Sequence, residues 1–331
     1  MQATAVVFTA ANAVEVQTVQ CPEPGAEDVV IRVTHSWISN GTEGSFLRGE
    51  RIAGDTPRRP GDPVPFPIVA GYQKIGVVEW IGDAVTDLAV GETVFAATSK
   101  VDGMFSPRGG HVSPAVTPHD QIWKLPDGVD SLAFAGLVLT QVGYNCGVRA
   151  APTIGDGALV FGDGMVGQWT AQTLAWRGAD VLVVGRHADR LAKLPSSPHV
   201  HTVNEREDDW RQVAERRLPQ GIQIAVDTAG SIPLVAALSS LVARGGHIVS
   251  AGFYGAEDQL ALQPLRNREI SLDFVSGWTR NRMDQTLRLI AAGYLQTLPL
   301  ITHHFPVEQA AAAWDLITTR REPVLGVILD W

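Results

Sequence analysis

A glycine-rich turn between an apolar run and a helical pattern constrains this chain more than any other feature. The apolar run 158–161 leads into the sequence GDGMVG at 162–167, and the helical pattern 168–174 follows. A strand, a glycine-rich turn and a helix start in that order form a binding site for the pyrophosphate of a dinucleotide, where N–H groups and the helix dipole meet the anion. An ordinary tight turn is the alternative. The sequence therefore predicts an α/β unit that binds a dinucleotide.

Length, composition and charge indicate a soluble protein of two domains. The chain has 331 residues, more than one hydrophobic core usually supports, and no apolar run approaches the roughly 18 residues that span a bilayer. The amino terminus lacks the features of a secretory signal, and the only two cysteines, Cys21 and Cys146, fit a reducing cytoplasm. The net charge of −9 disfavours nucleic acids and anionic membranes as partners. We therefore expect a cytoplasmic protein that acts on a small molecule.

Two patterns divide the chain. The first ~125 residues carry short β-like runs between glycine and proline clusters, which indicates a strand-rich, partly barrel-like domain. The proline-rich segment 48–67 is predicted to be a long surface loop, either a cover for a site or a plain connector. From Ser131 onward strands and helices alternate, which predicts a parallel sheet covered on both faces. The expected elements are strands at 179–185, 222–227, 246–252, 270–275 and 324–329 and helices at 234–241, 283–293 and 307–318.

The end of the second strand of this sheet bears on the choice of nucleotide. In NAD sites an acidic residue about 20 residues beyond the glycines usually binds the adenosine ribose. Here the sequence is Gly185-Arg186-His187, with Arg190 one helical turn further, so no carboxylate is expected at that strand end. The two arginines can pair with a 2′-phosphate, which favours NADP(H). If Arg186 instead stacks on the adenine or faces solvent, NAD(H) is equally acceptable.

Short motifs along the whole chain resemble the medium-chain dehydrogenase/reductase superfamily. They are EDVV at 27–30, IVAGYQ at 68–73, VGETV at 90–94, LPDGV at 125–129, the glycine motif and VDTAG at 226–230. The resemblance implies a GroES-like catalytic domain at 1–137 and 277–331, a Rossmann dinucleotide-binding domain at 138–276, and a homodimer. The expected cofactor-binding residues are Thr140, Gly162, Gly164, Met165, Val166, Gly167, Gly185, Arg186, His187, Arg190, Thr228, Ala251 and Gly252.

The zinc ligands of that superfamily are missing from the sequence. Ser39 stands at the expected cysteine, Gly71-Tyr72-Gln73 replaces Gly-His-Glu, and nothing near Gly136 can bind metal. Serine, tyrosine and glutamine are poor zinc ligands beside thiolate and imidazole. The segment 96–114 also lacks the cysteines of the structural zinc lobe. The resemblance therefore points to a zinc-independent branch.

Within the superfamily the sequence resembles the bacteriochlorophyllide a dehydrogenase group, which oxidises a hydroxyethyl side chain of the pigment ring to acetyl. The chain departs from that group in Asn40, Gln73 and the proline-rich insertion, all around the expected pocket, so the pigment substrate stays open. The likeness rests on IS at 38–39, GTE at 41–43, PIV at 67–69, GY at 71–72, AGFY at 251–254, LITH at 300–303, AAAA at 310–313 and LDW at 329–331.

Without a metal, a side chain must act as general base for alcohol oxidation or as general acid for carbonyl reduction. Tyr72 is the first candidate, because it stands at the position of a lost ligand and a phenol, with an ordinary pKa of about 10, suits an acid better than a base. Glu43 and Thr42 are the next candidates, as a relay or as groups that orient the substrate. The alternative for each is a structural role.

Further side chains are candidates for contacts with the substrate. Trp37, Asn40 and Gln73 are expected to line the pocket, and Trp278 is expected near the nicotinamide, although such a tryptophan is more often part of a core. The histidines at 199, 201, 303 and 304 have no further ligand at metal spacing and are interpreted as solvated loop residues, so no metal site is expected.

Three functions are compatible with these features. The leading one is hydride transfer between NAD(P) and a secondary alcohol or its ketone, on a substrate that is expected to be bulky. The alternatives are NADPH-dependent reduction of an enone or quinone, and a dinucleotide-binding protein without catalysis. The reaction products distinguish the first two, and the absence of any turnover would favour the third.

Overall fold

The computed structural model describes all residues, 1–331, and divides them into two compact units. Unit 1 comprises residues 1–138 and 297–331, and unit 2 comprises residues 139–296. The first boundary lies one residue beyond the expected 137, but the second differs, because residues 277–296 belong to unit 2 and not to unit 1. Gln296 explains this, since its backbone bonds to the side chains of Trp169 and Gln172 in unit 2. No helix combines the length and the apolar character needed to cross a bilayer.

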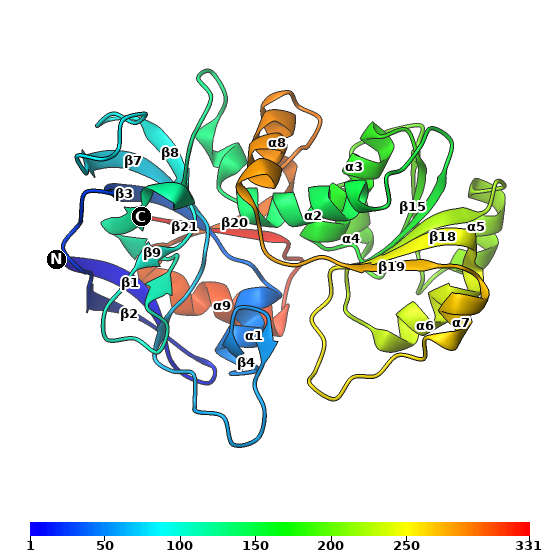
Figure 1. Ribbon diagram of the computed structural model, residues 1–331, viewed down its shortest axis with the longest axis horizontal. Helices are drawn as coiled ribbons and strands as arrows, with labels where there is room; N and C mark the ends of the chain where they lie inside the picture. The colour runs from blue at the N-terminus through cyan, green and yellow to red at the C-terminus, as the bar shows by residue number, and fades with distance from the viewer. The chain divides into compact units, whose positions relative to one another are not determined.

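Unit 1 consists mainly of β-strands (Figure 1). Its larger sheets are a four-stranded one, ordered β11-β1-β2 with β6 on β1, and a seven-stranded one, ordered β13-β8-β7-β3-β21-β20 with β12 on β3. The strands are β1 Gln2–Ala10, β2 Ala13–Gln20, β3 Asp28–Trp37, β4 Arg51–Ala53, β5 Thr56–Pro57, β6 Ile68–Val69, β7 Lys74–Ile81, β8 Thr93–Ala96, β9 Ser99–Lys100, β10 Arg108–Gly109, β11 Val112–Ser113, β12 Ala115–Pro118, β13 Ile122–Lys124, β20 Ile301–Pro306 and β21 Gly326–Asp330. The helices are α1 Thr42–Leu47 and α9 Ala310–Thr319, with 3₁₀ turns at His119–Gln121, Ser131–Phe134, Leu298–Leu300 and Val307–Gln309.

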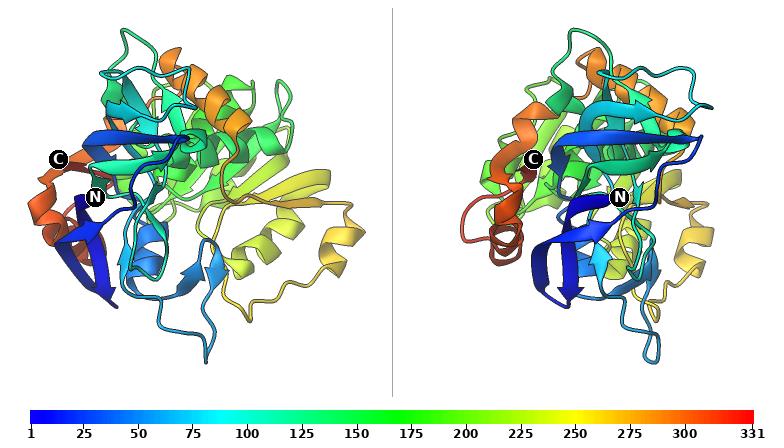
Figure 2. Two further views of the ribbon diagram at one scale, coloured as in Figure 1. Left: turned by 60° about the vertical axis from the view of Figure 1, so that its left-hand side comes forward. Right: turned by 90° about the vertical axis from the view of Figure 1, so that its left-hand side faces the viewer.

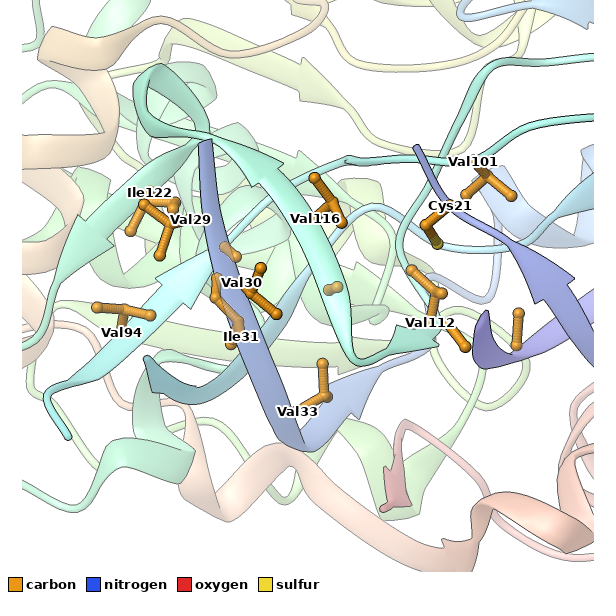
Figure 3. Packing of buried hydrophobic residues seen from close by; sticks show 14 of the residues in the cluster. Cys21, Val29, Val30, Ile31, Val33, Val94, Val101, Val112, Val116 and Ile122 are labelled. Atoms are coloured by element: carbon orange, nitrogen blue, oxygen red, sulfur yellow. The ribbon is translucent and has the colours of Figure 1, made fainter. Parts of the chain in front are cut away.

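Strand β1 contributes to two hydrophobic cores of unit 1, because successive side chains of a strand point to opposite faces. Ala5 and Val7 belong to the core that Figure 3 shows, in which Val29, Val94 and Ile122 lie together and Cys21 lies beside Val101 and Val112. Val6 and Phe8 belong to the second core, which α9 closes from the side of β2. Trp314 on α9 and Phe8 pack in a T-shaped arrangement, with their ring centroids 5.4 Å apart.

The proline-rich segment 48–67, which the sequence predicts to be a long surface loop, contains a short pair of strands. Strands β4 and β5 pair as a hairpin inside it, and in both views of Figure 2 this hairpin and the chain beyond it project past α1. The buried guanidinium of Arg51 explains the order, since it donates to Ser45 Oγ on α1 and to Gly54 O and Asp55 Oδ1 in the turn. One cation thus ties the hairpin to the body of unit 1.

Unit 2 is a doubly wound α/β unit. Its six strands are all parallel and are ordered β16-β15-β14-β17-β18-β19, the Rossmann order, as the sequence predicts. The strands are β14 Gly157–Phe161, β15 Asp180–Gly185, β16 Val200–Asn204, β17 Ile222–Asp227, β18 Val242–Ser250 and β19 Ser271–Phe274. The helices are α2 Leu137–Arg149, α3 Met165–Trp176, α4 Ala188–Leu191, α5 Trp210–Arg217, α6 Ile232–Leu241, α7 Gln263–Asn267 and α8 Arg280–Ala291.

Both faces of this sheet are buried. Within β14, Leu159 and Phe161 join a core with residues of α5 and α6, whereas Ala158 and Val160 join a core with residues of α2 and α3. In Figure 1, α6 and α7 accordingly lie on the opposite side of the sheet from α3. The near-continuous apolar runs of these strands follow from this double coverage.

Two histidine assignments from the sequence are wrong. His201 lies in β16, the edge strand of the parallel sheet, and His199 directly precedes that strand, so the segment is not a simple loop. His303 and His304 lie in β20, which pairs with β21. Both strands are short, lie at the edges of their sheets and contain few apolar residues, so their strand pattern was weak in the sequence.

Candidate active site

The glycine motif of unit 2 has the shape that a pyrophosphate requires. Gly162 has a φ of +116°, and a Cβ there would lie 2.2 Å from Thr228 Oγ1. A Cβ on Gly167 would lie 2.0 Å from Gly162 O, so helix α3 packs on the turn only with glycine at this position. A Cβ on Gly164, the N-cap of α3, would meet nothing within 4 Å. Two glycines are thus needed by the fold, and the third leaves open space at the helix amino end.

A cavity of about 450 Å³ adjoins this turn at the carboxyl ends of the parallel strands. Arg186 and His187 lie along one side of it, and Trp210 and Arg211 lie along another, with the Arg211 guanidinium 4.4 Å above the Trp210 ring. Open parallel sheets bind ligands at this edge, beside the switch in strand order, which here falls between β14 and β17. The cavity therefore lies where a fold of this kind would bind a nucleotide.

Contrary to expectation, carboxylates do lie at the end of β15. Asp163, inside the glycine motif, accepts the backbone N–H groups of Arg186 and His187 at 2.7 and 2.8 Å. It also binds the His187 ring and lies 3.5 Å from Arg190 Nη1. Burial opposes the ionisation of Asp163, but these hydrogen bonds outweigh it and lower its pKa. The sequence did not indicate this carboxylate, because residues 163 and 186 are far apart in the chain and only the fold brings them together.

Glu205, which follows β16, is the second carboxylate at this edge. It accepts from Arg186 Nε at 2.5 Å, while the Arg186 side chain remains 66% exposed. Arg186 is therefore still accessible from the cavity, but Arg190 is only 14% exposed and faces Asp163. The structure thus leaves Arg186 as the accessible cation of the two predicted arginines.

The other expected cofactor residues lie in the same unit. Met165 and Val166 form the first turn of α3, and Thr228 donates from its hydroxyl to Phe161 O at 2.8 Å. Gly252, two residues after the end of β18, packs on Gly230 so closely that a Cβ would lie 1.9 Å from the Gly230 Cα. Thr140 is buried in α2, Ala251 precedes Gly252, and Trp278 is partly buried between β19 and α8.

Tyr72 lies at the centre of a polar cluster in unit 1. The side-chain hydroxyls of Ser39 and Thr42 and the carboxylate of Glu43 lie near its phenol. Burial raises the pKa of Tyr72, and the negative charge of Glu43 raises it further, while the two hydroxyl groups and Arg51 partly oppose this shift. Helix α1 supplies Thr42 and Glu43, and the turn before β7 supplies Tyr72. The predicted catalytic residues Tyr72, Glu43 and Thr42 therefore do come together.

His111, which was not among the residues predicted from the sequence, is a further member of this cluster. Its Nε2 lies 2.9 Å from Glu43 Oε2, and its Nδ1 lies 2.8 Å from Ser36 Oγ. The other oxygen of Glu43 accepts the backbone N–H of Ser39 at 2.8 Å. A Cβ on Gly71 would lie 2.5 Å from the His111 ring, so the imidazole fills the space beneath the Gly71-Tyr72 turn. No motif in the sequence links residue 111 to residue 43.

The three expected pocket residues of unit 1 differ in their accessibility. Trp37 and Gln73 are fully buried, and Gln73 Nε2 donates to Trp37 O at 3.1 Å. Their role in the structure is packing, which departs from the expectation that they line the pocket. Asn40 is only partly buried, and its Nδ2 donates to Leu325 O at 2.7 Å, which leaves the side-chain oxygen without a partner. Asn40 thus remains a candidate for contact with a substrate.

Two family models match the chain, one in each unit. Residues 25–127 match the alcohol dehydrogenase GroES-like domain, and residues 166–292 match the zinc-binding dehydrogenase family. Together they cover more than half of the sequence, in the order that the medium-chain enzymes have. This chain belongs to the medium-chain dehydrogenase/reductase superfamily. It is therefore related to alcohol-dehydrogenase-like oxidoreductases, and the predicted α/β fold of a GroES-like and a Rossmann domain is confirmed.

Individual members of the superfamily match the chain along its whole length. A 2-desacetyl-2-hydroxyethyl bacteriochlorophyllide A dehydrogenase from Cereibacter sphaeroides is 29% identical, over 100% of this chain and 99% of that protein. A D-xylulose reductase from Morganella morganii is 24% identical, over 94% of this chain and 96% of that protein. The crystal structure of a short chain alcohol dehydrogenase from E. coli CFT073, complexed with NADH, has a TM-score of 0.85 at 21% identity and covers 100% of this chain and 99% of its own, which shows the shared fold.

Since the superfamily includes zinc-binding members, the side chains that stand at the expected zinc-ligand positions decide whether this chain could bind the metal. Ser39, Tyr72 and Gln73 offer hydroxyl and amide groups, and the Gln73 amide nitrogen points at a backbone carbonyl. Both nitrogens of the nearby His111 already have partners. No three histidine, cysteine, aspartate or glutamate side chains converge in a way that could hold a metal ion. Since zinc prefers thiolate, imidazole and carboxylate ligands, these residues do not fit it.

Proposed function

We propose that this chain is an NAD(P)-dependent oxidoreductase that interconverts a secondary alcohol and its ketone without a catalytic zinc. The observation that carries the proposal is the cluster of Tyr72, Ser39 and Thr42, which puts three hydroxyl groups where zinc-dependent relatives are expected to hold their metal. Membership of the superfamily supports the reaction type. The names of the bacteriochlorophyllide dehydrogenase and the D-xylulose reductase support an alcohol or ketone substrate, and the former supports a bulky one.

The dinucleotide is proposed to bind unit 2. The open space at Gly164, at the amino end of α3, suits the pyrophosphate, and the 450 Å³ cavity suits the adenosine. Arg186, exposed beside that cavity, can pair with a 2′-phosphate, which favours NADP(H), with NAD(H) as the alternative. Relatives of the same fold carry either cofactor, since one was crystallised with NADH and another with NADP. When bound, the nicotinamide supplies or accepts the hydride.

Tyr72 is proposed to donate a hydrogen bond, and then a proton, to the substrate oxygen during carbonyl reduction. Its raised pKa keeps the phenol protonated at neutral pH, which suits an acid and opposes a role as a base. In the reverse direction the alcohol proton must return to the phenolate, so oxidation is expected to be slow until the pH is high. Thr42 and Ser39 are proposed to orient the phenol, and the partly exposed Asn40 can donate a further hydrogen bond to the substrate through the second hydrogen of its amide nitrogen.

The assembly and the compartment belong to the same proposal. The resemblance implies a homodimer, and the two units are proposed to serve as the catalytic and the dinucleotide-binding domain. Both cysteines are buried and unpaired, which a reducing cytoplasm allows.

The proposal is tested by supplying NADPH or NADH with panels of bulky ketones, enones and quinones and identifying the products. We expect the ketone to be reduced to a secondary alcohol. About one alcohol should form for each reduced dinucleotide consumed, as followed by the loss of absorbance at 340 nm. A saturated ketone or a quinol would replace the proposal by reduction of a double bond or quinone. Tight dinucleotide binding with no product from any panel would favour a protein that binds the cofactor without catalysis.

A further inference from the structure

His111 is a buried titratable group that contacts the proposed catalytic cluster, yet the proposed function gives it no role. The side chains of His111 and Glu43 are 0% and 2% exposed, and Ser36 is also fully buried. The main chain of His111 is fixed as well, since its N–H donates to Ala70 O at 2.7 Å and its carbonyl accepts from Val6 N at 3.0 Å. The imidazole therefore has one fixed position beneath the Gly71-Tyr72 turn.

The hydrogen bonds around His111 run in one direction. Trp331 Nε1 can only donate, and it donates to Ser36 Oγ at 2.9 Å. The Glu43 carboxylate can only accept, so His111 Nε2 carries the proton that it donates, and Nδ1 is the acceptor that the structure offers to the Ser36 hydroxyl hydrogen. The backbone N–H of Ser39 donates to the same carboxyl group from the other side. Every donor in this chain of contacts thus leads to Glu43.

We infer that His111 is a positioning residue of the catalytic centre: through Nε2 it holds Glu43, and Glu43 holds the backbone of Ser39, so that the start of α1 stays in place beside Tyr72. The inference rests on the proposed function, because it assigns the aligned phenol as the acid. His111 does not reach the phenol itself, since both of its nitrogens are used by Ser36 and Glu43. We therefore expect loss of the hydrogen bond to Glu43 to slow turnover, and loss of the hydrogen bond to Ser36 to have little effect on turnover.

Two substitutions separate these bonds. His111→Gln places an amide N–H near the position of Nε2 and keeps a donor for Glu43, whereas His111→Asn places its amide near Nδ1 and keeps only a partner for Ser36. We expect His111→Asn to lower kcat about 10- to 100-fold with the KM for the dinucleotide unchanged, and His111→Gln to stay within about threefold of the wild type. Thermal unfolding is measured for both, because a purely structural role would lower Tm in parallel and would not split the rates. Equal kcat values for the two variants would overturn the inference.

A second measurement does not depend on turnover. In ¹⁵N-histidine NMR spectra of the full chain, assigned by difference with His111→Asn, we expect the imidazole proton of His111 on Nε2 and not on Nδ1, and a changed Nε2 resonance in Glu43→Gln. A proton on Nδ1, or no response to Glu43→Gln, would overturn the inference. If this signature is present but the wild type reduces no carbonyl compound, the proposed function fails while the contact from His111 to Glu43 stands. If carbonyl reduction is found but the signature is absent, the positioning role fails alone.

Discussion

The two candidate sites of this molecule are built in opposite ways. The dinucleotide site of unit 2 comes from one continuous turn, 162–167, whose backbone conformation and missing side chains create the space. The polar cluster of unit 1 joins Tyr72 and Glu43 to His111, Ser36 and Trp331, which come from separate strands, turns and helices. The comparison teaches that a local site is specified by local sequence, while a site of dispersed side chains depends on the strand pairing of the whole unit.

The substitution Tyr72→Phe is expected to have the largest effect, and it tests whether the two sites have separate roles. Removal of the hydroxyl leaves the ring in place but takes away the proposed acid, so kcat for ketone reduction should fall about 10²- to 10⁴-fold. The dissociation constant for NADPH should not change, because the cofactor is proposed to bind unit 2. Steady-state kinetics and fluorescence titration measure the two quantities. Turnover within threefold of the wild type would remove Tyr72 from the chemistry.

Substitutions in the glycine turn are expected to have the next largest effect, and Gly164 serves as a matched control for Gly162 in the same motif. Gly162→Ala forces a Cβ to 2.2 Å from Thr228 Oγ1 at a positive φ, so we expect about 2–4 kcal/mol lower stability together with loss of dinucleotide binding. Gly164→Ala meets no atom within 4 Å, so stability should be kept while NADPH binding weakens about 10-fold or more. Urea unfolding and NADPH titration distinguish the two. Unaltered binding by Gly164→Ala would show that the phosphates do not pass there.

A smaller effect is expected from Lys74 in unit 1, where this buried residue should make the free energy of unfolding depend on pH. The ammonium is fully buried with Nζ 2.6 Å from Ala97 O, and burial lowers its pKa to about 7. Because the unfolded lysine keeps its proton up to about pH 10, the unfolded state binds more protons above pH 7, and stability rises with pH. Between pH 7 and 8.5 this group should add about 1.5 kcal/mol to the free energy of unfolding. Lys74→Met should abolish that slope in urea titrations, and an unchanged slope would assign it to another group.

Cofactor choice gives the smallest expected effect and concerns only unit 2. Arg186→Ala should weaken NADPH binding about 10-fold and leave NADH binding nearly unchanged, because only NADPH carries the 2′-phosphate. Glu205→Gln should act in the opposite direction, since it removes a carboxylate that competes for Arg186. Binding titrations with both dinucleotides measure the ratio. Parallel changes for NADH and NADPH in Arg186→Ala would indicate stacking on adenine instead of contact with a phosphate.

The contrast between the units also explains what could be predicted from the sequence. The glycine motif and the buried strands were predictable because spacing and alternation are local, and β14, β15 and β17 lie within a residue of their expected bounds. Tyr72, Thr42 and Glu43 could be named because they stand at or beside positions of lost ligands. His111 could not, since it contacts Glu43 only through strand pairing. Asp163 was hidden for the same reason, and the β4–β5 hairpin depends on one buried arginine.

The central claim is that hydroxyl groups, and not a metal, assist hydride transfer in this member of the superfamily. It is tested most directly by measuring ketone turnover with NADPH before and after exhaustive treatment with a zinc chelator, together with the zinc content of the active protein. The account predicts a substoichiometric zinc content and an unchanged kcat. Loss of turnover on chelation, restored by added zinc, would contradict it.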